Sequence, residues 1–377
     1  MESVDALSGT VIEQRTKPFS EIKKGYTWFS EEDVLFAKIT PCMQNGKIAI
    51  ARGLQGGFGF GTTEFHVLRP KEGIIPEIIW HYLRQPQFLD KATDHFTGAV
   101  GQQRLPADYL ANLEMPLPSL PEQKRIATIL KEQMAAVEKA RVAAEARLEA
   151  ASALVESYYR EAFGNTPAFS ATPIVPTRPV RDGWCWNRLT GIARLATGHT
   201  PSRYHSEYWN GDVPWLQLAD IRALDGKEAF DTIEHTNPLG IENSASVILP
   251  KGTVCMSRTA SVGFFTIMGR DMATSQDFVN WVCTPEFDPW FLMHLLISCR
   301  KQIRELGSGA VHNTIYFPTV QAFSVCVPPL SEQKRIASNL KEQMAVVEKA
   351  KAAAEAELET INALPAVLLC RAFNGEL

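Results

Sequence analysis

The chain has 377 residues, of which 45% are hydrophobic, enough for two domains of ordinary size with apolar cores. Its formal net charge of −4 excludes a uniformly basic surface, so any nucleic-acid site has to be a local patch. The seven cysteines form no C-x-x-C pair and no His/Cys cluster at metal-ligand spacing, and the longest apolar run, near Trp290 to Cys299, is too short to span a bilayer. We therefore expect a cytoplasmic protein with reduced thiols, no metal site and no membrane segment.

Residues 1–116 form the first expected globular domain. Within it, residues 33–38 resemble residues 253–258 further along the chain. Only 32 residues precede Asp33, whereas 69 residues run from 184 to 252 at the corresponding place. The first domain is therefore expected to lack its opening strands, with Met1 as an internal methionine taken as a start or as the beginning of a truncated chain.

Residues 117–164 are expected to form a long helix, because Ala, Glu, Lys, Gln, Leu and Arg replace the prolines that open the segment. Apolar residues recur at steps of three, four and seven from Ile126 to Ala162, which gives one continuous stripe. A helix over the 43 residues from 121 to 163 is roughly 64 Å long at about 1.5 Å per residue. Seven Lys/Arg and seven Asp/Glu in that range cancel, so the helix is a poor candidate for binding phosphate.

Residues 165–183 form a linker rich in proline and threonine, and residues 184–326 are expected to form a second, mixed α/β domain. The runs 246–249 and 253–256 are typical of strands, and residues 289–306 are typical of a helix.

Residues 327–377 repeat the first helix. Residues 327–350 match residues 117–140 at 18 of 24 positions, an internal duplication with an offset of 210. The apolar stripe runs from Ile336 to Ile361, and Pro365 is expected to end or kink the helix. The fold class is thus α+β, with two mixed α/β domains, each followed by a long helix, and the two helices packing as an antiparallel coiled coil that acts as a spacer.

A globular domain followed by a helix that opens with prolines and Glu-Gln-Lys-Arg-Ile-Ala, and then both again, resembles the specificity subunits of type I restriction–modification systems. Residues 196–202 and 208–215 resemble the opening of that family's target-recognition domain. Residues 36–42, 45–47 and 63–65 resemble a variant of the same domain. The resemblance covers essentially the whole chain.

The resemblance implies that each target-recognition domain reads one half of a split, asymmetric sequence in double-stranded DNA. The helices would set the gap between the half-sites and bind two DNA methyltransferase subunits, and restriction/translocase subunits would join that core. S-adenosylmethionine and ATP with Mg²⁺ would then be bound by the partners, and this chain would bind no cofactor or metal and have no catalytic residue.

Reading a duplex requires hydrogen-bonding side chains in a groove and cationic or amide contacts to phosphates, so polar loop residues are the candidates. In the second domain the candidates are Thr200, Ser202, Arg203, Tyr204, Gln217, Arg222, Ser257, Arg258, Thr259, Asn313 and Thr314. In the first domain they are Lys38, Thr40, Gln44, Asn45, Lys47, Gln102, Gln103 and Arg104. Trp209 and Trp215 are more typical of a core than of base stacking.

Two other functions remain open at this stage. One is a coiled-coil scaffold for protein partners whose domains have lost or partial DNA recognition. The other is a nuclease with scattered acidic ligands. The sequence contains no G-x-x-x-x-G-K-[ST] loop for ATP, and Asn237-Pro238-Leu239-Gly240 departs from the Asn-Pro-Pro motif of amino-methyltransferases, so a DNA-recognition subunit without its own catalysis is the leading hypothesis.

Overall fold

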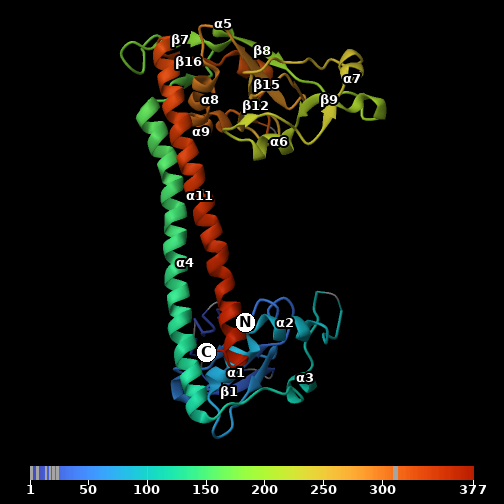
Figure 1. Ribbon diagram of the computed structural model, residues 1–377, viewed down its shortest axis with the longest axis vertical. Helices are drawn as coiled ribbons and strands as arrows, with labels where there is room; N and C mark the ends of the chain where they lie inside the picture. The colour runs from blue at the N-terminus through green and yellow to red at the C-terminus, as the bar shows by residue number, and fades with distance from the viewer. Residues whose placement is uncertain are drawn as a thin grey trace. The chain divides into compact units, whose positions relative to one another are not determined.

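The computed structural model describes residues 3–5, 8–12, 15–16, 18, 22, 25–99, 101–308 and 313–377, so the expected start at Met1 lies outside the described residues. The chain divides into two compact units. Unit 1 consists of Met1–Arg147 and Ala353–Leu377, and unit 2 consists of Leu148–Ala352. Each of the two long helices contributes one end to unit 1 and the other end to unit 2 (Figure 1).

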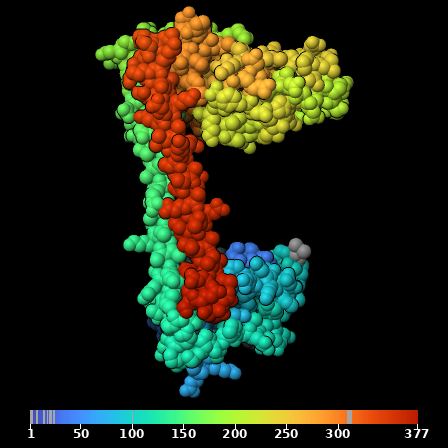
Figure 2. Space-filling model, viewed as in Figure 1, coloured from blue at the N-terminus to red at the C-terminus, as the bar shows by residue number. Residues whose placement is uncertain are grey.

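The two long helices are α4 (Leu120–Phe163) and α11 (Leu330–Phe373), each of 44 residues, as the repeated motif predicts. Of the two expectations for Pro365, an end or a kink, the end is wrong, because α11 continues to Phe373 with Pro365 inside it. Beyond the proline, Leu369 and Ala372 are buried in an apolar cluster of unit 1. This packing compensates for the helix hydrogen bond that a proline cannot donate. Figure 2 shows this end of α11, in red, against the blue and cyan residues of unit 1.

The helices pack against each other in an antiparallel sense. In unit 1, Ile126 near the start of α4 shares a core cluster with Leu369 near the end of α11, while Arg147, further along α4, forms an ion pair with Glu357, further back along α11. In unit 2, the end of α4 shares a core with the start of α11. The prediction of an antiparallel coiled coil is confirmed.

Unit 1 contains a three-stranded sheet of order β3-β2-β5 and a separate pair β1-β4, all antiparallel. The strands are β1 (Tyr26–Ser30), β2 (Val34–Ala37), β3 (Ile48–Ile50), β4 (Phe58–Thr62) and β5 (Phe65–Leu68). The short helices are α1 (Pro76–Leu83), α2 (Pro86–Thr93) and α3 (Ala107–Ala111). Apolar residues of β2 and β3 share a core with residues of α1 and α2, so these helices cover the sheet.

Unit 2 contains a five-stranded sheet of order β10-β13-β12-β15-β8 and two three-stranded sheets, β11-β9-β14 and β6-β16-β7. The strands are β6 (Phe169–Ser170), β7 (Cys185–Arg188), β8 (Ala193–Thr197), β9 (Trp209–Leu216), β10 (Glu228–Ala229), β11 (His235–Thr236), β12 (Val254–Ser257), β13 (Phe265–Met268), β14 (Ala273–Thr274), β15 (Phe278–Cys283) and β16 (Ser324–Val327). The short helices are α5 (Leu189–Ile192), α6 (Leu218–Ala223), α7 (Pro238–Glu242), α8 (Pro289–Ser298), α9 (Arg300–Glu305) and α10 (Phe317–Gln321).

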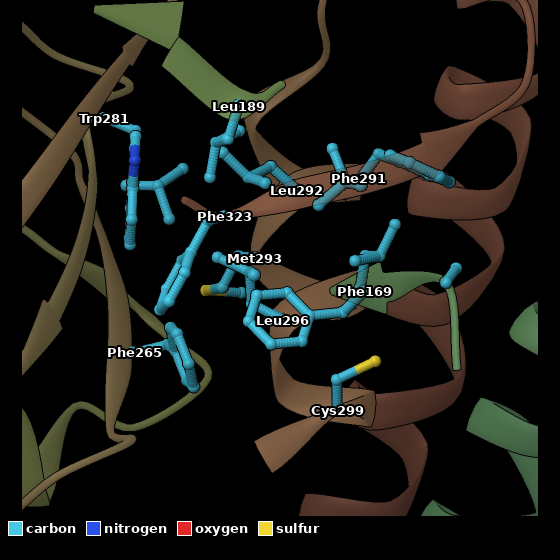
Figure 3. Close-up of a cluster of buried hydrophobic side chains, with 14 of the residues drawn as sticks. Phe169, Leu189, Phe265, Trp281, Phe291, Leu292, Met293, Leu296, Cys299 and Phe323 are labelled. Carbon is cyan, nitrogen blue, oxygen red and sulfur yellow. The ribbon is translucent and has the colours of Figure 1, made fainter. Parts of the chain in front are cut away.

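The largest core of unit 2 lies between the five-stranded sheet and α8. Figure 3 shows Trp281 of β15 facing Phe323, whose ring lies 6.1 Å from it in a stacked arrangement. Phe169, from the linker, meets Phe323 edge to face at 4.7 Å. Phe291 and Leu292 of α8 are fully buried in the same cluster. The proline-rich linker therefore contributes to this core as well as connecting the segments on either side of it.

The elements of unit 2 confirm two of three predictions and contradict one. The run 253–256 falls in β12, and the helical stretch 289–306 forms α8 and α9, separated at Cys299. The run 246–249 is not a strand, because Val247 and Ile248 are exposed and its pairing is limited, among the described residues, to one isolated bridge from Leu249 to Met272.

The same three-stranded core occurs in both units. β2 pairs antiparallel with β3 and β5 in unit 1, just as β12 pairs antiparallel with β13 and β15 in unit 2. In unit 2, β15 also pairs with β8, whereas in the described part of unit 1 β5 pairs with β2 alone. The duplication seen in the sequence therefore extends to the sheets.

Candidate nucleic-acid interface

In unit 2, two loops that are far apart in the sequence lie together at one end of the five-stranded sheet. The amide of Ile315 donates to the carbonyl of Arg258 at 2.9 Å, and the amide of Ala260 donates to the carbonyl of Asn313 at 3.0 Å. Thr259 and Thr314 form an isolated β-bridge. The predicted residues Arg258, Thr259, Asn313 and Thr314 therefore share one surface.

Ser257 and Arg222 shape this loop. Ser257 is fully buried, where its hydroxyl donates to the carbonyl of Ser261 and accepts from the amide of Phe264 at 3.2 Å. The Nε of Arg222 donates to the Ser261 hydroxyl at 2.9 Å from α6. The Ser257 hydroxyl is thus engaged inside the loop, whereas Arg222 keeps other N–H groups at the surface.

Gln217 has a structural role at the start of α6. It is the N-cap of that helix, where its side chain accepts a backbone hydrogen bond while its own amide donates to Asp220 at 2.9 Å. This reciprocal pair is a capping box.

A second group of candidates lies on the loop before β9. Arg203 forms a bidentate ion pair with Glu234, at 2.9 and 2.6 Å, and its guanidinium stacks over Trp209 at 4.0 Å and Trp215 at 5.0 Å. Trp215 is buried and Trp209 is half-buried, which agrees with their predicted place in a core. The next residue, Tyr204, is 99% exposed.

The two groups are joined through Gln276. The Thr200 hydroxyl donates to the side-chain oxygen of Gln276, and Nη2 of Arg258 donates to the Gln276 carbonyl at 3.0 Å. Ser202 lies beside Arg203 in the chain, and its carbonyl accepts from the indole of Trp209 at 3.2 Å. The loop before β9 and the loop after β12 are therefore connected through Thr200, Gln276 and Arg258.

Unit 1 repeats the loop pair. The amide of Leu105 donates to the carbonyl of Lys38 at 2.9 Å, the counterpart of the Ile315–Arg258 bond, and the amide of Thr40 donates to the carbonyl of Gln103 at 2.9 Å. Loops 38–47 and 97–105 thus lie together. The loops carry the other candidates Gln44, Asn45, Lys47, Gln102 and Arg104, of which Gln44, Asn45 and Gln102 are exposed.

Ion pairing separates the cationic candidates into two kinds. Arg104 contacts both oxygens of Glu64 at 2.9 Å and holds the pKa of that carboxyl below its usual value, and Arg203 has the same effect on Glu234. These two carboxylates stay charged and neutralise their partners. Arg222 and Arg258 have no carboxylate partner among the described residues.

Sequence reasoning missed three groups of residues. The sequence does not point to Gln276, which joins the two groups of unit 2. It indicates Arg304 only as part of a helix, although the Nε of this residue donates to the Val262 carbonyl at 3.1 Å. Gln123 and Gln333 belong to the repeated Glu-Gln-Lys-Arg-Ile-Ala motif, but the motif alone does not indicate that both side chains are buried and hydrogen-bonded. Their identical positions in the repeat were the one available signal.

The described part of the chain holds no group of three or more His, Cys, Asp or Glu side chains arranged to bind a metal ion. Along the same residues, no helix combines the length and the hydropathy needed to cross a bilayer.

A family model described as the type I restriction modification DNA specificity domain matches residues 9–145 and 181–360. The chain is 42% identical over 118 residues to the specificity subunit of the type I restriction enzyme EcoEI from Escherichia coli, and 39% identical over 142 residues to that of EcoAI from the same organism. These matches cover 30% and 37% of this chain but only 19% and 24% of the relatives' lengths. A longer match, 23% identical over 326 residues, covers 82% of this chain and 67% of the StySPI specificity subunit from Salmonella potsdam.

Two solved structures share the fold. A chain from a structure described as showing complex assembly and conformational transition of the type I R-M system has a TM-score of 0.78 and 21% identity, covering 100% of this chain and 90% of its own length. The HsdS subunit from Thermoanaerobacter tengcongensis has a TM-score of 0.62 and 20% identity, covering 100% and 89%.

Proposed function

The chain belongs to the type I restriction–modification DNA specificity family, and from this premise we propose that it recognises a two-part sequence in duplex DNA and directs a methyltransferase and a restriction enzyme to it. Unit 1 would read one part of the target and unit 2 the other. The activity of the assembled enzyme, its substrate and its partners are all part of this proposal.

The observation that carries the proposal is the repeated loop pair. In each unit a loop that follows the central strand, beginning with Lys38 or Arg258, is hydrogen-bonded to a second loop rich in amide and hydroxyl side chains. Arg, Asn and Gln side chains match the donor and acceptor edges of guanine and adenine, and Thr and Ser suit either. Two such surfaces on one chain fit two half-sites better than one continuous site.

The proposal also assigns the chemistry to partners. Two methyltransferase subunits would bind S-adenosylmethionine, and restriction/translocase subunits would bind ATP with Mg²⁺, while this chain supplies recognition without catalysis. The absence of a phosphate-binding G-x-x-x-x-G-K-[ST] motif from the sequence supports placing ATP elsewhere. Because the DNA that such a complex would methylate is the cell's own, the complex would act in the cytoplasm of a prokaryote.

Selection from a random-sequence duplex library tests this function. The chain is co-expressed with a methyltransferase subunit of its own system, the complex is purified, and bound duplexes are amplified and sequenced. We expect enrichment of two short defined sequences at a fixed spacing. A complex that assembles but enriches no sequence would contradict recognition and favour a scaffold, and metal-dependent cutting of DNA by the isolated chain would favour a nuclease.

A further inference from the structure

Four arginines surround the loop 258–264 between β12 and β13. Arg222 reaches it from α6, Arg300 and Arg304 reach it from α9, and Arg258 begins it. These side chains come from segments up to 82 residues apart, so the sequence gives no basic run at this place. In a chain of net charge −4, the cluster is a local concentration of positive charge.

Among the described residues, a carboxylate neutralises only one of the four arginines. Arg300 forms an ion pair with Asp225 at 2.8 Å, so its charge is compensated. Its guanidinium also lies over the rings of Phe264 and Phe265, so the side chain packs against the end of the loop. Arg222, Arg258 and Arg304 donate instead to neutral oxygens and have no carboxylate partner among the described residues. Three guanidinium charges therefore remain available for an anion.

The loop is shaped to bring these side chains close. Gly263 has a φ of +80°, and a Cβ at this position would lie 3.1 Å from Cγ of Arg304. A larger residue would therefore be strained and would push Arg304 away. Ala260 also has a positive φ, of 58°, which is unfavourable for a residue with a side chain and is held here by its hydrogen bond to Asn313.

Hydrogen bonds hold two of the arginines against the loop. Arg304 uses its Nε to bind the Val262 carbonyl, and Arg222 binds Ser261, so the bound edge of each guanidinium faces the loop. The remaining N–H groups of both side chains have no protein acceptor in the described part of unit 2. Side chains held in this way offer charged N–H groups at a fixed place on the protein, whereas the side chain of Tyr204 is 99% exposed.

We infer that Arg222, Arg258 and Arg304 form a phosphate-binding cluster that holds the backbone of duplex DNA without reading its base sequence. This inference rests on the proposed function and assigns two tasks within it. The arginine cluster would contact phosphates, whereas the loop before β9 and the loop that contains Asn313 would contact bases. Phosphate contacts fix register and carry most of the salt dependence of binding, whereas base contacts carry sequence preference.

The salt dependence of DNA binding tests the inference. The complex of the chain with its methyltransferase subunit is titrated against a fluorescein-labelled scrambled duplex and a duplex of the selected sequence, between 50 and 200 mM salt. The slope of log affinity against log salt is negative, and each lost phosphate contact reduces its magnitude by about 0.9, so that the ratio of affinities at the two salt concentrations falls about three- to fourfold.

We expect Arg304→Gln and Arg222→Gln each to reduce the magnitude of the slope by about one and to weaken binding to both duplexes equally. Arg304→Lys retains the charge and is expected to keep the slope. Arg270→Gln is the matched control, because Arg270 is an exposed arginine of unit 2 beyond the opposite end of β13. Thermal melting by circular dichroism verifies that each variant is folded.

Unchanged slopes in Arg304→Gln and Arg222→Gln would overturn the inference, and so would a loss confined to the selected sequence, because that pattern belongs to base reading. Failure of the proposed function gives a different result. There the selection would enrich no sequence and the wild-type complex would bind any two duplexes of equal length equally, whatever the arginine variants do to the slope.

Discussion

Two glutamines at equivalent positions of the repeat, Gln123 and Gln333, fix the start of a short helix to the start of a long one. Gln333 accepts from the amide of Asp288, the N-cap of α8, and donates to the carbonyl of Pro328, both at 2.9 Å. Gln123 accepts from the amide of Ile75, the N-cap of α1, at 3.1 Å. A buried amide that joins two elements is costly to replace, because the backbone groups that it bonds would be left without a hydrogen-bond partner.

Replacing Gln333 with Leu is expected to destabilise unit 2 by about 1–3 kcal/mol, because the amide of Asp288 and the carbonyl of Pro328 would be buried without partners. Urea unfolding followed by tryptophan fluorescence measures this, since six of the eight tryptophans lie in unit 2. The matched control is Gln321→Leu, at an exposed position of α10. An equal, small effect for both variants would show that the buried amide contributes little.

The buried histidine His294 predicts how the stability of unit 2 depends on pH. Burial lowers its pKa to about 4, the positive charge of Lys341 adds to the effect, and its Nδ1 lies 3.1 Å from the hydroxyl of Tyr159. Above pH 6.5 the histidine is neutral in both the folded and the unfolded chain. Below pH 6.5 the unfolded chain binds a proton that the folded chain does not, so stability falls until the pH reaches about 4.

We expect the free energy of unfolding to fall by at most about 1.4 kcal/mol per pH unit from this residue between pH 6.5 and 4. His294→Gln removes the titrating group, so the difference between wild type and variant isolates the histidine from the carboxylates that titrate in the same range. Urea unfolding at half-unit pH steps is the measurement. Parallel curves for the two proteins would contradict the assignment.

At the scale of elements, the two long helices depend on their apolar stripes for stability, because their charged residues lie mostly on exposed faces. Leu340 of α11 is only 1% exposed and belongs to the core of unit 2, while Val346, six residues later on the same helix, is 65% exposed. The pattern of three, four and seven in the sequence separates these two positions, since Leu340 lies on the stripe and Val346 does not.

Leu340→Ala is expected to cost about 2–5 kcal/mol, because a fully buried side chain leaves a cavity, and Val346→Ala is expected to change stability by less than about 0.5 kcal/mol. Both variants make the same kind of truncation on one helix, so helix propensity affects them in a similar direction. Thermal melting of the two proteins at the same concentration gives the comparison. Similar melting temperatures would mean that α11 is not held by this stripe.

The long helices and the strongest strands could be predicted from the sequence because each carries many residues of one pattern. The two-residue strands β6, β10, β11 and β14 could not, since two residues hold no periodicity and owe their extended form to a neighbouring strand. The same reason explains the error at 246–249. Its apolar, β-branched residues suit a strand, but only Leu249 forms a bridge to another segment.

At the scale of the whole molecule, the candidate site could also be predicted only in part from the sequence. Polar loop residues such as Arg258 and Asn313 could be selected locally because the duplicated loops gave them a context. Arg304 could not be selected in this way, because its place in the site depends on a hydrogen bond to Val262, 42 residues away, and on the close approach that Gly263 allows. Loop composition therefore indicates candidates, whereas the charge pattern of the site comes from contacts between distant segments.

The central claim is that this chain selects DNA sequences for a modification enzyme. Methylome sequencing of host DNA tests it most directly, with the gene present or deleted and with a methyltransferase subunit of its own system expressed in both cultures. If the chain selects DNA sequences, a modified motif in two parts occurs only when the gene is present. A complex shown by co-purification to assemble, yet leaving no gene-dependent motif, would contradict it.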